Sequence, residues 1–453
     1  MNRRNFIKNS SLASLGMLST RAGSQEKQSE NTKRTDKLNI GFIGVGLRGR
    51  DHLELALLRP DCNVSAICDT DPLSIKEAQK LAEKAGKGEL KVFTGEDRAY
   101  LKMLEMKSLD AVIIATPWLW HTEMAIAAMK AGKYTGVEVS GGFSLDECWQ
   151  LVNTHEATGS HLFFLENVCY RRDIMAVLNM VRKDLFGELI HMECGYQHDL
   201  RNVKFNDGKQ PYGGGVEFGE KGFSEAKWRT TQSLNRNGDL YPTHGIGPVS
   251  KMLNINSGNR FLYLTSTASK AKGLHEYIVN HPQGGNSHPN ATIEWKLGDV
   301  VTSVLKTING ESIVITHDTN LPRPYSLGFR VQGTKGLWMD VNSSIYTEGL
   351  NDKHKWQPAK EFLEKYDHQL WKKYENDARG AGHGGMDFFL LHEFVECAKA
   401  NASASIDVYD AATWMAITPL SEQSIATGSM PQPFPDFTRG RWTERTNGFA
   451  VEQ

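Results

Sequence analysis

A tyrosine and a histidine stand close together in the segment from Asn237 to Gly245, which is bounded by glycine and proline and leads into a predicted helix. The histidine is His244, and an imidazole is a side chain that suits the transfer of a proton to or from a hydroxyl group. The tyrosine, Tyr241, can donate a hydrogen bond to the same oxygen or accept one from it. The plainer interpretation is a capped helix start with a structural histidine, and the residue types alone leave both open.

A glycine-rich turn near the beginning of the chain has the residues that bind a diphosphate. The sequence GVGLRG at residues 44–49 is a G-x-G-x-x-G that follows a short apolar run and precedes an amphipathic helix. The first glycine permits the tight turn, the second lets the backbone approach a pyrophosphate, and the third allows close packing of helix on strand. We expect Leu47 and Arg48 to contribute mainly backbone N–H groups, so that their side chains matter less.

An aspartate ends the second predicted strand, about 20 residues after the glycines. This residue, Asp69, would accept hydrogen bonds from the adenosine ribose hydroxyls and would repel a 2′-phosphate. The strand, helix, second strand and terminal acid all follow in the expected order. The pattern therefore predicts a dinucleotide fold that binds NAD in preference to NADP.

Aromatic and polar residues follow the ends of later predicted strands. Trp118 and His121 should face the nicotinamide ribose, although they can equally be two packing aromatics. Glu138 and Asn167 need partners if they are buried, and a ribose hydroxyl and the nicotinamide amide would serve. The predicted cofactor contacts are Gly44, Gly46, Leu47, Arg48, Gly49, Asp69, Trp118, His121, Glu138, Val139 and Asn167.

The elements that must position these residues alternate between strand and helix. Strands are predicted at 40–45, 64–68, 91–93, 109–117, 134–139 and 161–165, with helices at 71–85, 100–106, 123–131 and from 145 to about 158. Such alternation is typical of a doubly wound parallel sheet, whose ligands bind at the carboxyl ends of the strands.

The pattern changes after residue 167. A helix at 171–185 is followed mainly by strands, which we place at 189–198, 261–266, 290–296, 300–307, 312–316, 328–333 and 336–341. Glycine-containing turns between several of them favour an antiparallel arrangement. Late helices are predicted at 386–400 and 408–424. The predicted fold is α/β, with an N-terminal Rossmann domain and a C-terminal α+β domain built on a large, mainly antiparallel sheet.

We divide the chain into a signal and linker at 1–37, a dinucleotide-binding domain at 38–167, and a substrate and possible dimerisation domain at 168–453. Net charge is −1, from 52 basic and 53 acidic residues. Neither nucleic acid nor a membrane surface is favoured as a partner. No apolar run approaches the roughly 18 residues that span a bilayer. The six cysteines show no metal-finger spacing, and we assign neither a disulfide nor a metal site.

The N-terminus resembles a twin-arginine export signal. Arg3 and Arg4 are followed by Asn5-Phe6-Ile7-Lys8 and then by a weakly apolar, serine-rich stretch. A disordered basic tail is the alternative. The resemblance implies export by the twin-arginine route to the periplasm, with the cofactor acquired before export because that route carries folded proteins.

From residue 38 to the C-terminus, the chain resembles the Gfo/Idh/MocA superfamily and, within it, glycoside hydrolase family 109, the NAD-dependent α-N-acetylgalactosaminidases. The most specific matching motifs are Glu138–Ser140, Glu166–Tyr170, Asn237–Gly245 and Gly382–Asp387. Dehydrogenases of the superfamily usually have a lysine at the position of Val139 and an acid at the position of Leu240. Both groups are lost here, which favours the glycosidase family.

The resemblance implies a hydrolysis that uses NAD⁺ without consuming it. Hydride leaves sugar C3, the resulting carbonyl acidifies the C2 proton, and the anomeric substituent is eliminated. Water then adds and the hydride returns to C3, so no pair of carboxylates flanking the glycosidic bond is required. A tightly held nucleotide follows from this cycle.

The resemblance also implies roles for particular residues. Tyr241, His244 and His383 match catalytic positions, and His383 lies in a glycine-rich loop that is either an active-site cover or a plain flexible loop. The residues that match sugar-contacting positions are Tyr196, Arg229, Tyr241, His244 and Tyr325.

The leading hypothesis is a retaining exo-glycosidase that acts on terminal α-linked N-acetylgalactosamine, as a small molecule or at the end of a glycan. One alternative is an NAD-dependent sugar or inositol dehydrogenase. Another is a non-catalytic protein that senses a sugar or a nucleotide. A homo-oligomer is possible, because a large sheet offers a face for dimerisation.

Overall fold

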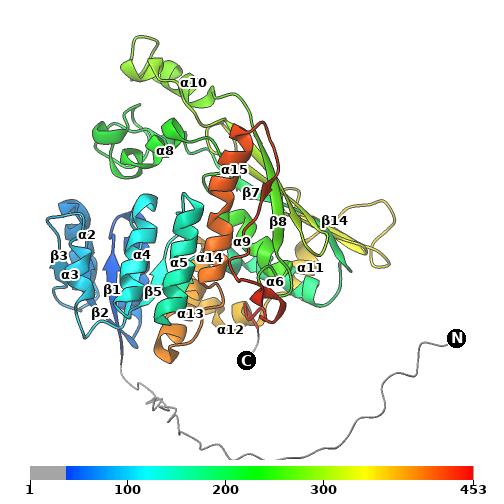
Figure 1. Ribbon diagram of the computed structural model, residues 1–453, viewed down its shortest axis with the longest axis horizontal. Coiled ribbons are helices and arrows are strands. Elements are labelled where there is room, and N and C mark those ends of the chain that lie inside the picture. The colour runs from blue at the N-terminus through cyan, green and yellow to red at the C-terminus, as the bar shows by residue number, and fades with distance from the viewer. Residues whose placement is uncertain (1–36, 452–453) are drawn as a thin grey trace, which may run out of the picture. The chain divides into compact units, whose positions relative to one another are not determined.

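A parallel sheet of six strands forms the first half of the computed structural model, which describes residues 37–451 (Figure 1). The predicted export signal lies outside the described residues. The strand order is β3-β2-β1-β4-β5-β6, the order of a Rossmann fold. The strands are β1 (Leu38–Ile43), β2 (Cys62–Cys68), β3 (Lys91–Phe93), β4 (Ala111–Ile114), β5 (Tyr134–Val137) and β6 (Leu162–Phe164).

Helices connect these strands, as the sequence predicted. They are α1 (Leu47–Leu58), α2 (Pro72–Lys84), α3 (Tyr100–Leu104), α4 (His121–Lys130) and α5 (Leu145–Thr158), with short 3₁₀ turns η1 (Trp118–Trp120) and η2 (Asn167–Tyr170). The best-defined start belongs to α5, where Ser144 and Glu147 form a reciprocal capping box. Because the sheet is parallel, all six strands end at the same edge, and the segments after β1, β2, β4, β5 and β6 bear site residues.

A nine-stranded sheet forms the second half, in the order β14-β13-β12-β11-β7-β10-β9-β8-β15. Only β7 and β10 pair in parallel, so the sheet is mainly antiparallel as predicted. The strands are β7 (Leu189–Gln197), β8 (Phe261–Ala268), β9 (Val300–Thr307), β10 (Ser312–Asp318), β11 (Arg330–Gly333), β12 (Gly336–Met339), β13 (Ser344–Thr347), β14 (Gln357–Pro358) and β15 (Gln432–Pro433).

One face of this sheet is covered and the other is open. Helix α9 packs on β7, and α15 packs on β8. Leu305 on β9 is fully buried, whereas Val304 beside it is 42% exposed. This alternation is the period of two that a half-covered strand requires.

The remaining helices belong to the second half. They are α6 (Arg172–Arg182), α7 (Arg201–Lys204), α8 (Arg229–Asn235), α9 (Thr243–Met252), α10 (Gly273–Asn280), α11 (Lys360–Lys365), α12 (Gln369–Ala378), α13 (Met386–Ala400), α14 (Val408–Met415) and α15 (Ile417–Ala426). Short 3₁₀ turns are η3 (Gly219–Lys221), η4 (Ser224–Lys227), η5 (Pro289–Thr292), η6 (His383–Gly385) and η7 (Arg441–Thr443).

Two predicted elements differ from the structure. The expected strand at 290–296 is instead the turn η5 followed by coil, because Pro289 lacks the N–H that a central strand donates and His288 caps the turn. The expected helix at 408–424 is two helices that meet at Ala416. Most residues of the first helix and half of those of the second are buried.

The last helices return to the first sheet rather than staying with the second. Helix α13 packs against α1 and β1, and α14 packs against α5 and β6. Figure 1 shows α14 in orange beside the cyan helix α5. Phe164 of β6 donates a backbone hydrogen bond to Ile406, 3.0 Å away. The predicted boundary at residues 167 and 168 therefore separates two stretches of sequence. The hydrophobic core around the first sheet contains residues from both stretches.

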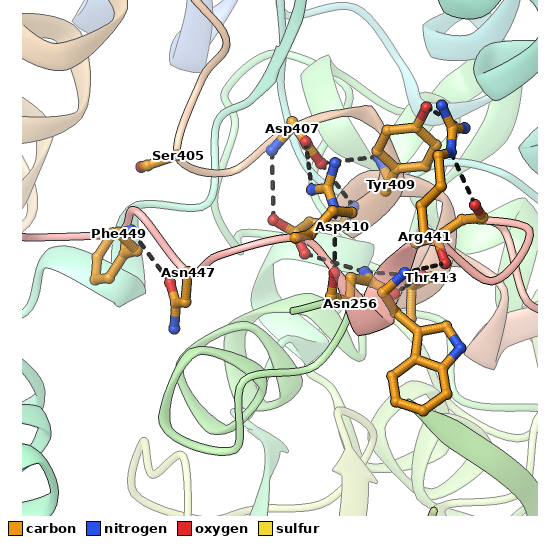
Figure 2. A network of polar contacts seen from close by, with 12 residues as sticks. Asn256, Ser405, Asp407, Tyr409, Asp410, Thr413, Arg441, Asn447 and Phe449 are labelled. Carbon is orange, nitrogen blue, oxygen red and sulfur yellow. Dashed lines mark hydrogen bonds and ion pairs between the residues drawn. The ribbon is translucent and has the colours of Figure 1, made fainter. Parts of the chain in front are cut away.

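A polar network holds the C-terminal segment in place (Figure 2). Lys251 forms a buried ion pair with Asp410 at 2.5 Å. Asn256 donates to the same carboxylate at 3.1 Å, and Arg445 pairs with Asp407 at 2.7 Å. These contacts connect α9, the N-terminus of α14 and the chain after β15, so the tail contributes to the core that supports α9.

Within residues 37–451 no helix is long and apolar enough to cross a membrane. No group of three or more histidine, cysteine, aspartate or glutamate side chains in that part of the chain is arranged to hold a metal ion.

Candidate active site

A histidine and a buried glutamate form a pair at the point where the two halves of the chain meet. His244 lies in the first turn of α9, and Glu166 directly follows β6. Nδ1 of His244 is 2.7 Å and 3.0 Å from the two carboxylate oxygens of Glu166, which is fully buried. Because the carboxylate accepts the Nδ1 proton, the Nε2 atom keeps the lone pair and serves as the proton acceptor.

Aromatic rings surround this histidine. The ring of Tyr241 is 4.8 Å from the imidazole of His244 and 4.5 Å from the ring of Tyr196 on β7. Trp118, from the edge of the first sheet, packs 5.4 Å from Tyr241. Burial raises the pKa of both tyrosines, so each phenol stays protonated and available as a donor at neutral pH.

Arg229 and Tyr325 complete the predicted sugar-contacting set. The Arg229 guanidinium lies 4.7 Å from the Trp118 ring and pairs with Glu225 at 3.3 Å. Tyr325 is half exposed, and its ring lies 6.3 Å from that of Tyr196. The structure thus brings together all five residues that the sequence predicted for the sugar, and it adds Trp118, which was predicted to face the cofactor.

The glycine-rich turn has the shape that a dinucleotide requires. A Cβ atom on Gly49 would lie 2.0 Å from the Gly44 carbonyl oxygen, so only glycine fits there. A Cβ on Gly46 would meet nothing within 4 Å, which leaves the approach to the N-terminus of α1 open for a pyrophosphate. Gly44 itself has φ +84°, a conformation that favours glycine. These residues fit the diphosphate of NAD.

Asp69 is positioned by the same turn. Its carboxylate accepts hydrogen bonds from the backbone N–H groups of Val45 at 2.7 Å and Asp71 at 2.9 Å. These bonds hold the side chain beside the turn at the end of β2, where an adenosine ribose lies in folds of this type. The predicted preference for NAD over NADP is consistent with an acid fixed at this point.

We expected Arg48 to contribute mainly its backbone N–H, but its side chain makes several polar contacts. Its Nε atom donates to Glu138 at 2.6 Å, and its two terminal nitrogens donate to Asp387 at 2.6 Å and 3.0 Å. Although burial opposes it, the two carboxylates raise the pKa of Arg48 above its ordinary value. The side chain connects α1, the end of β5 and α13, so that prediction was wrong.

Glu138 and Asn167 find partners within the protein. His52 Nε2 lies 2.6 Å from Glu138, and Asn167 donates to Asp387 at 2.8 Å. Although burial opposes it, the charge of Arg48 and the hydrogen bond with His52 lower the pKa of Glu138 to about 2. Their predicted contacts with a ribose hydroxyl and the nicotinamide amide remain predictions, as does that of Val139, which is buried beside Glu138.

The structure places His383 with these charged residues. Its Nδ1 atom is 2.7 Å from Asp387 and 3.3 Å from Arg48, and the hydrogen bond with Asp387 raises the pKa of His383. Its φ of +53° belongs to the glycine-rich loop in which it stands. His383 thus joins the contact network of the glycine-rich turn, and its predicted catalytic role stays a prediction.

His121 braces the backbone. One ring nitrogen is 2.5 Å from the carbonyl oxygen of Ser140, and the other is 2.7 Å from that of Thr116. Burial lowers the pKa of His121, although both carbonyls oppose this. With both nitrogens engaged, this side chain shapes the ends of β4 and β5, and a direct cofactor contact remains a prediction.

Three functional residues escaped sequence reasoning: Glu166, His52 and Asp387. Glu166 and Asp387 stand inside motifs already noticed, at a strand end and at a helix start, and a buried acid at either place is a usable signal. His52 had no signal beyond its place on the apolar face of α1.

Two family models match the chain. The model for the oxidoreductase family with an NAD-binding Rossmann fold matches residues 38–164. The model for the C-terminal domain of glycosyl hydrolase 109 matches residues 170–444. Together they account for both halves, and the chain has an NAD-binding Rossmann domain.

Relatives of similar length share about half of the residues. A glycosyl hydrolase family 109 protein of Stenotrophomonas maltophilia is 51% identical, over 100% of this chain and 99% of its own. An alpha-N-acetylgalactosaminidase of Tannerella forsythia is 49% identical, over 99% of each chain.

Among solved structures, a levoglucosan dehydrogenase in complex with NADH and levoglucosan superposes with a TM-score of 0.62. It covers 88% of this chain at 18% identity, which shows the shared fold. The match to both family models and the identity to full-length relatives show that this chain is a member of glycosyl hydrolase family 109, a glycosidase with an NAD-binding Rossmann domain.

Proposed function

We propose that this protein removes terminal α-linked N-acetylgalactosamine with retention of configuration, through a redox-neutral cycle at the sugar. The observation that carries the proposal is the His244–Glu166 pair, set among Tyr241, Tyr196 and Arg229 at the edge of an NAD-binding sheet. The substrate is suggested by the relative from Tannerella forsythia, which is an alpha-N-acetylgalactosaminidase.

The bound cofactor supplies reversible hydride exchange with the sugar. For that exchange, a proton must leave the hydroxyl on the carbon that is oxidised, and the Nε2 atom of His244 accepts it. Glu166 stabilises the imidazolium that forms, because the carboxylate is fully buried and already bonded to Nδ1. When the hydride returns, the same imidazolium gives the proton back, so the histidine ends the cycle as it began.

The aromatic residues position the sugar. Tyr196 and Tyr241 present protonated phenols as hydrogen-bond donors, and their rings offer apolar faces to the sugar ring. Arg229 remains charged while buried among Trp118 and Tyr241, so it donates hydrogen bonds to hydroxyl or acetamido oxygens.

The competing function is a net sugar or inositol dehydrogenase, which the shared fold also permits. Leu240 argues against it, because this residue packs with Leu297 and Val301 in an apolar cluster where the dehydrogenases carry an acid. Val139 likewise replaces the lysine that assists proton transfer in those enzymes. No observation favours a purely sensory role.

A 4-nitrophenyl α-N-acetylgalactosaminide separates these functions. We expect nitrophenol release without net accumulation of NADH when both absorbances are followed on the purified protein. Accumulation of NADH without nitrophenol would make the protein a dehydrogenase. A panel of other 4-nitrophenyl glycosides, run in parallel, tests the assignment of the sugar and the anomer.

We further propose export to the periplasm by the twin-arginine route, on the strength of Arg3 and Arg4 and the hydrophobic segment after them. A double replacement of these arginines by lysine should retain the protein in the cytoplasm when cell fractions are probed. Periplasmic recovery of that variant would contradict the proposal.

We also propose a homodimer that uses the open face of the nine-stranded sheet, where Tyr263 and Val304 are each 42% exposed. Light scattering after gel filtration should give twice the mass of the chain. A Val304→Lys substitution should shift the equilibrium toward the monomer, and an unchanged mass at all concentrations would place the interface elsewhere.

A further inference from the structure

A small, partly open cavity shares part of its wall with the sugar-contacting residues Tyr196, Arg229 and Tyr241. Its free volume is about 10 Å³, room for one water molecule or one monatomic ion. The wall residues that matter here are Trp118, Lys204, Arg229, Tyr241, His317 and Thr319. Lys204 and His317 are not among the residues assigned to the sugar, and each is at most 3% exposed.

The walls have more hydrogen-bond donors than their neighbours use. Lys204 donates to Thr319 at 2.8 Å and to Asn320 at 2.5 Å, which leaves the third proton of its ammonium group. Among the described residues, Nε of Arg229 and Nδ1 of His317 are buried and have no hydrogen-bond partner. The buried Nε–H of Arg229 is costly unless something in the cavity accepts from it, and the neutral His317 offers a second donor in the tautomer that has its proton on Nδ1.

The charge of the walls has one sign. Two cationic side chains, Lys204 and Arg229, line the cavity, and none of its walls is a carboxylate. The charged or titratable groups that act on Lys204 from the surrounding elements are Arg229 on α8, His317 and Asp318 on β10, Asp299 before β9 and Asp199 before α7. Asp299 accepts from the backbone N–H of Gly273, and Asp199 pairs with Arg201. Asp318 pairs with Arg323 through Oδ2, while its buried Oδ1 has no partner among the described residues.

The pKa of Lys204 is consistent with this excess of positive charge in the cavity wall. Burial, and then the positive charge of Arg229, lower the pKa of Lys204 to about 7. Burial likewise lowers the pKa of His317 to about 3, so the imidazole is neutral at physiological pH. An anion in the cavity would favour the charged ammonium and raise the pKa of Lys204, which couples anion binding to proton uptake.

We propose that this cavity is a binding site for one small monovalent anion, chloride in ordinary buffers, held between Lys204 and Arg229 with His317 as a further donor. The anion would balance the positive charge of Lys204. It would also hold the guanidinium of Arg229 in place against Trp118 and Tyr241. This inference concerns an ion site and holds whichever sugar the enzyme accepts.

Diffraction from the full-length protein crystallised without halide and soaked in sodium bromide tests the site directly. We expect one anomalous peak in the cavity, bonded to Lys204 and Arg229. A cavity that holds only water after the soak would overturn the proposal. A soaked N-acetylgalactosamine whose substituent fills the cavity and excludes bromide would make it part of the sugar site, and would overturn it as well.

Thermal unfolding tests the site in solution, with no need for activity. Replacing gluconate by chloride at constant ionic strength should raise the melting temperature by about 2 °C, because the ion binds the folded state alone. The rise should be larger at pH 6 than at pH 8, since deprotonation of Lys204 above its pKa of about 7 removes a ligand.

Lys204→Met should abolish the chloride response. Lys133→Met is a matched control, because Lys133 is also buried but donates to the carbonyl oxygens of Met106 and Leu109. That variant should keep the response even if its melting temperature is lower. A full response in Lys204→Met, or none in the unmodified protein, would show that the chloride effect does not arise in this cavity. The bromide experiment stands on the unmodified protein even if Lys204→Met does not fold.

Discussion

The contacts around Arg48 and those around His244 lie at the same edge of the six-stranded sheet but differ in how many of their polar groups have partners. Around Arg48, one guanidinium lies between two carboxylates, Glu138 and Asp387. A histidine also bonds each carboxylate, His52 to Glu138 and His383 to Asp387. Around His244 there is one carboxylate, Glu166, and the other neighbours are aromatic rings. The charged groups of the first region all have internal partners, although the buried Nδ1 of His52 has none among the described residues. The second region keeps Nε2 of His244 and two phenols for a ligand.

This difference indicates that the Arg48 region holds structural elements in position, whereas the His244 region carries out proton transfer. A paired, buried charge network is rigid because breaking it leaves an uncompensated charge, so it suits a scaffold that connects α1, β5 and α13. A site that moves protons needs groups whose hydrogen-bonding capacity is incomplete before the substrate arrives. Substitutions in the first region should therefore affect stability and cofactor retention, and those in the second should affect turnover.

The largest expected effect is on turnover at His244. His244→Ala removes the proton acceptor and should lower kcat by about 10²–10⁴-fold while bound NAD is retained. The measurement is the 4-nitrophenyl glycoside assay together with the nucleotide content of the purified protein. His191→Ala is the control, because His191 contacts Ser312 on the nine-stranded sheet. Normal turnover in His244→Ala would remove this residue from the mechanism.

Arg48→Met tests the scaffold. It leaves Glu138 and Asp387 buried without their cation, so the free energy of unfolding should fall by about 3–5 kcal/mol. Chemical denaturation measures this loss, and release of NAD on gel filtration should accompany it. Arg50→Met, in the same helix, loses only one bond to the Val45 carbonyl oxygen and should change stability much less. Equal losses in the two variants would contradict a special role for the Arg48 network.

The pH dependence of stability tests the same region. The pKa of Glu138 is depressed to about 2 in the folded protein, so its contribution is fully present above its unfolded pKa and is lost as pH falls toward 2. We expect this group to account for ~3 kcal/mol between pH 5 and pH 2. Comparing acid unfolding of the unmodified protein with that of Glu138→Gln measures it. The two stabilities should converge at low pH, and parallel curves would refute the depressed pKa.

Glu166→Gln separates charge from geometry in the second region. The amide still fills the space, but the negative charge that stabilises the imidazolium is gone. A hydrogen bond to a charged group contributes about 1.5–3 kcal/mol, so kcat should fall roughly 10- to 150-fold. The pH profile of kcat should also shift, which a purely structural change would not produce. An unshifted profile with a lower kcat would reduce Glu166 to a packing role.

The smallest effect is expected at Tyr325, the most exposed of the sugar-contacting residues. Tyr325→Phe removes one hydroxyl from a side chain that is half exposed. Loss of a neutral hydrogen bond of about 0.5–1.5 kcal/mol should lower kcat/KM roughly 2- to 12-fold. An increase in KM with little change in kcat would place Tyr325 in sugar binding. A loss of stability instead would assign it to the fold.

The local pattern of the sequence determined the glycine turn at 44–49, the helix at 386–400 and most of both sheets, since these depend on periods of two and 3.6 residues and on turn chemistry. It failed at 290–296, where apolar residues suggested a strand but Pro289 and the cap at His288 produced a turn. It also did not reveal that α13 and α14 pack on the first sheet, because amphipathic helices do not encode which sheet they cover.

Only the tertiary structure decided which residues act together. His244 and Glu166 are 78 positions apart, and Arg48 and Asp387 are 339 apart. The sequence showed a histidine suited to proton transfer and a glycine turn suited to a diphosphate. The fold brings the carboxylate of Glu166 to this histidine, and it brings the ion-pair partners of Arg48 to the glycine turn. Hydrogen bonds and ion pairs act over a few ångströms in space, and nothing in local periodicity specifies which distant segments come that close.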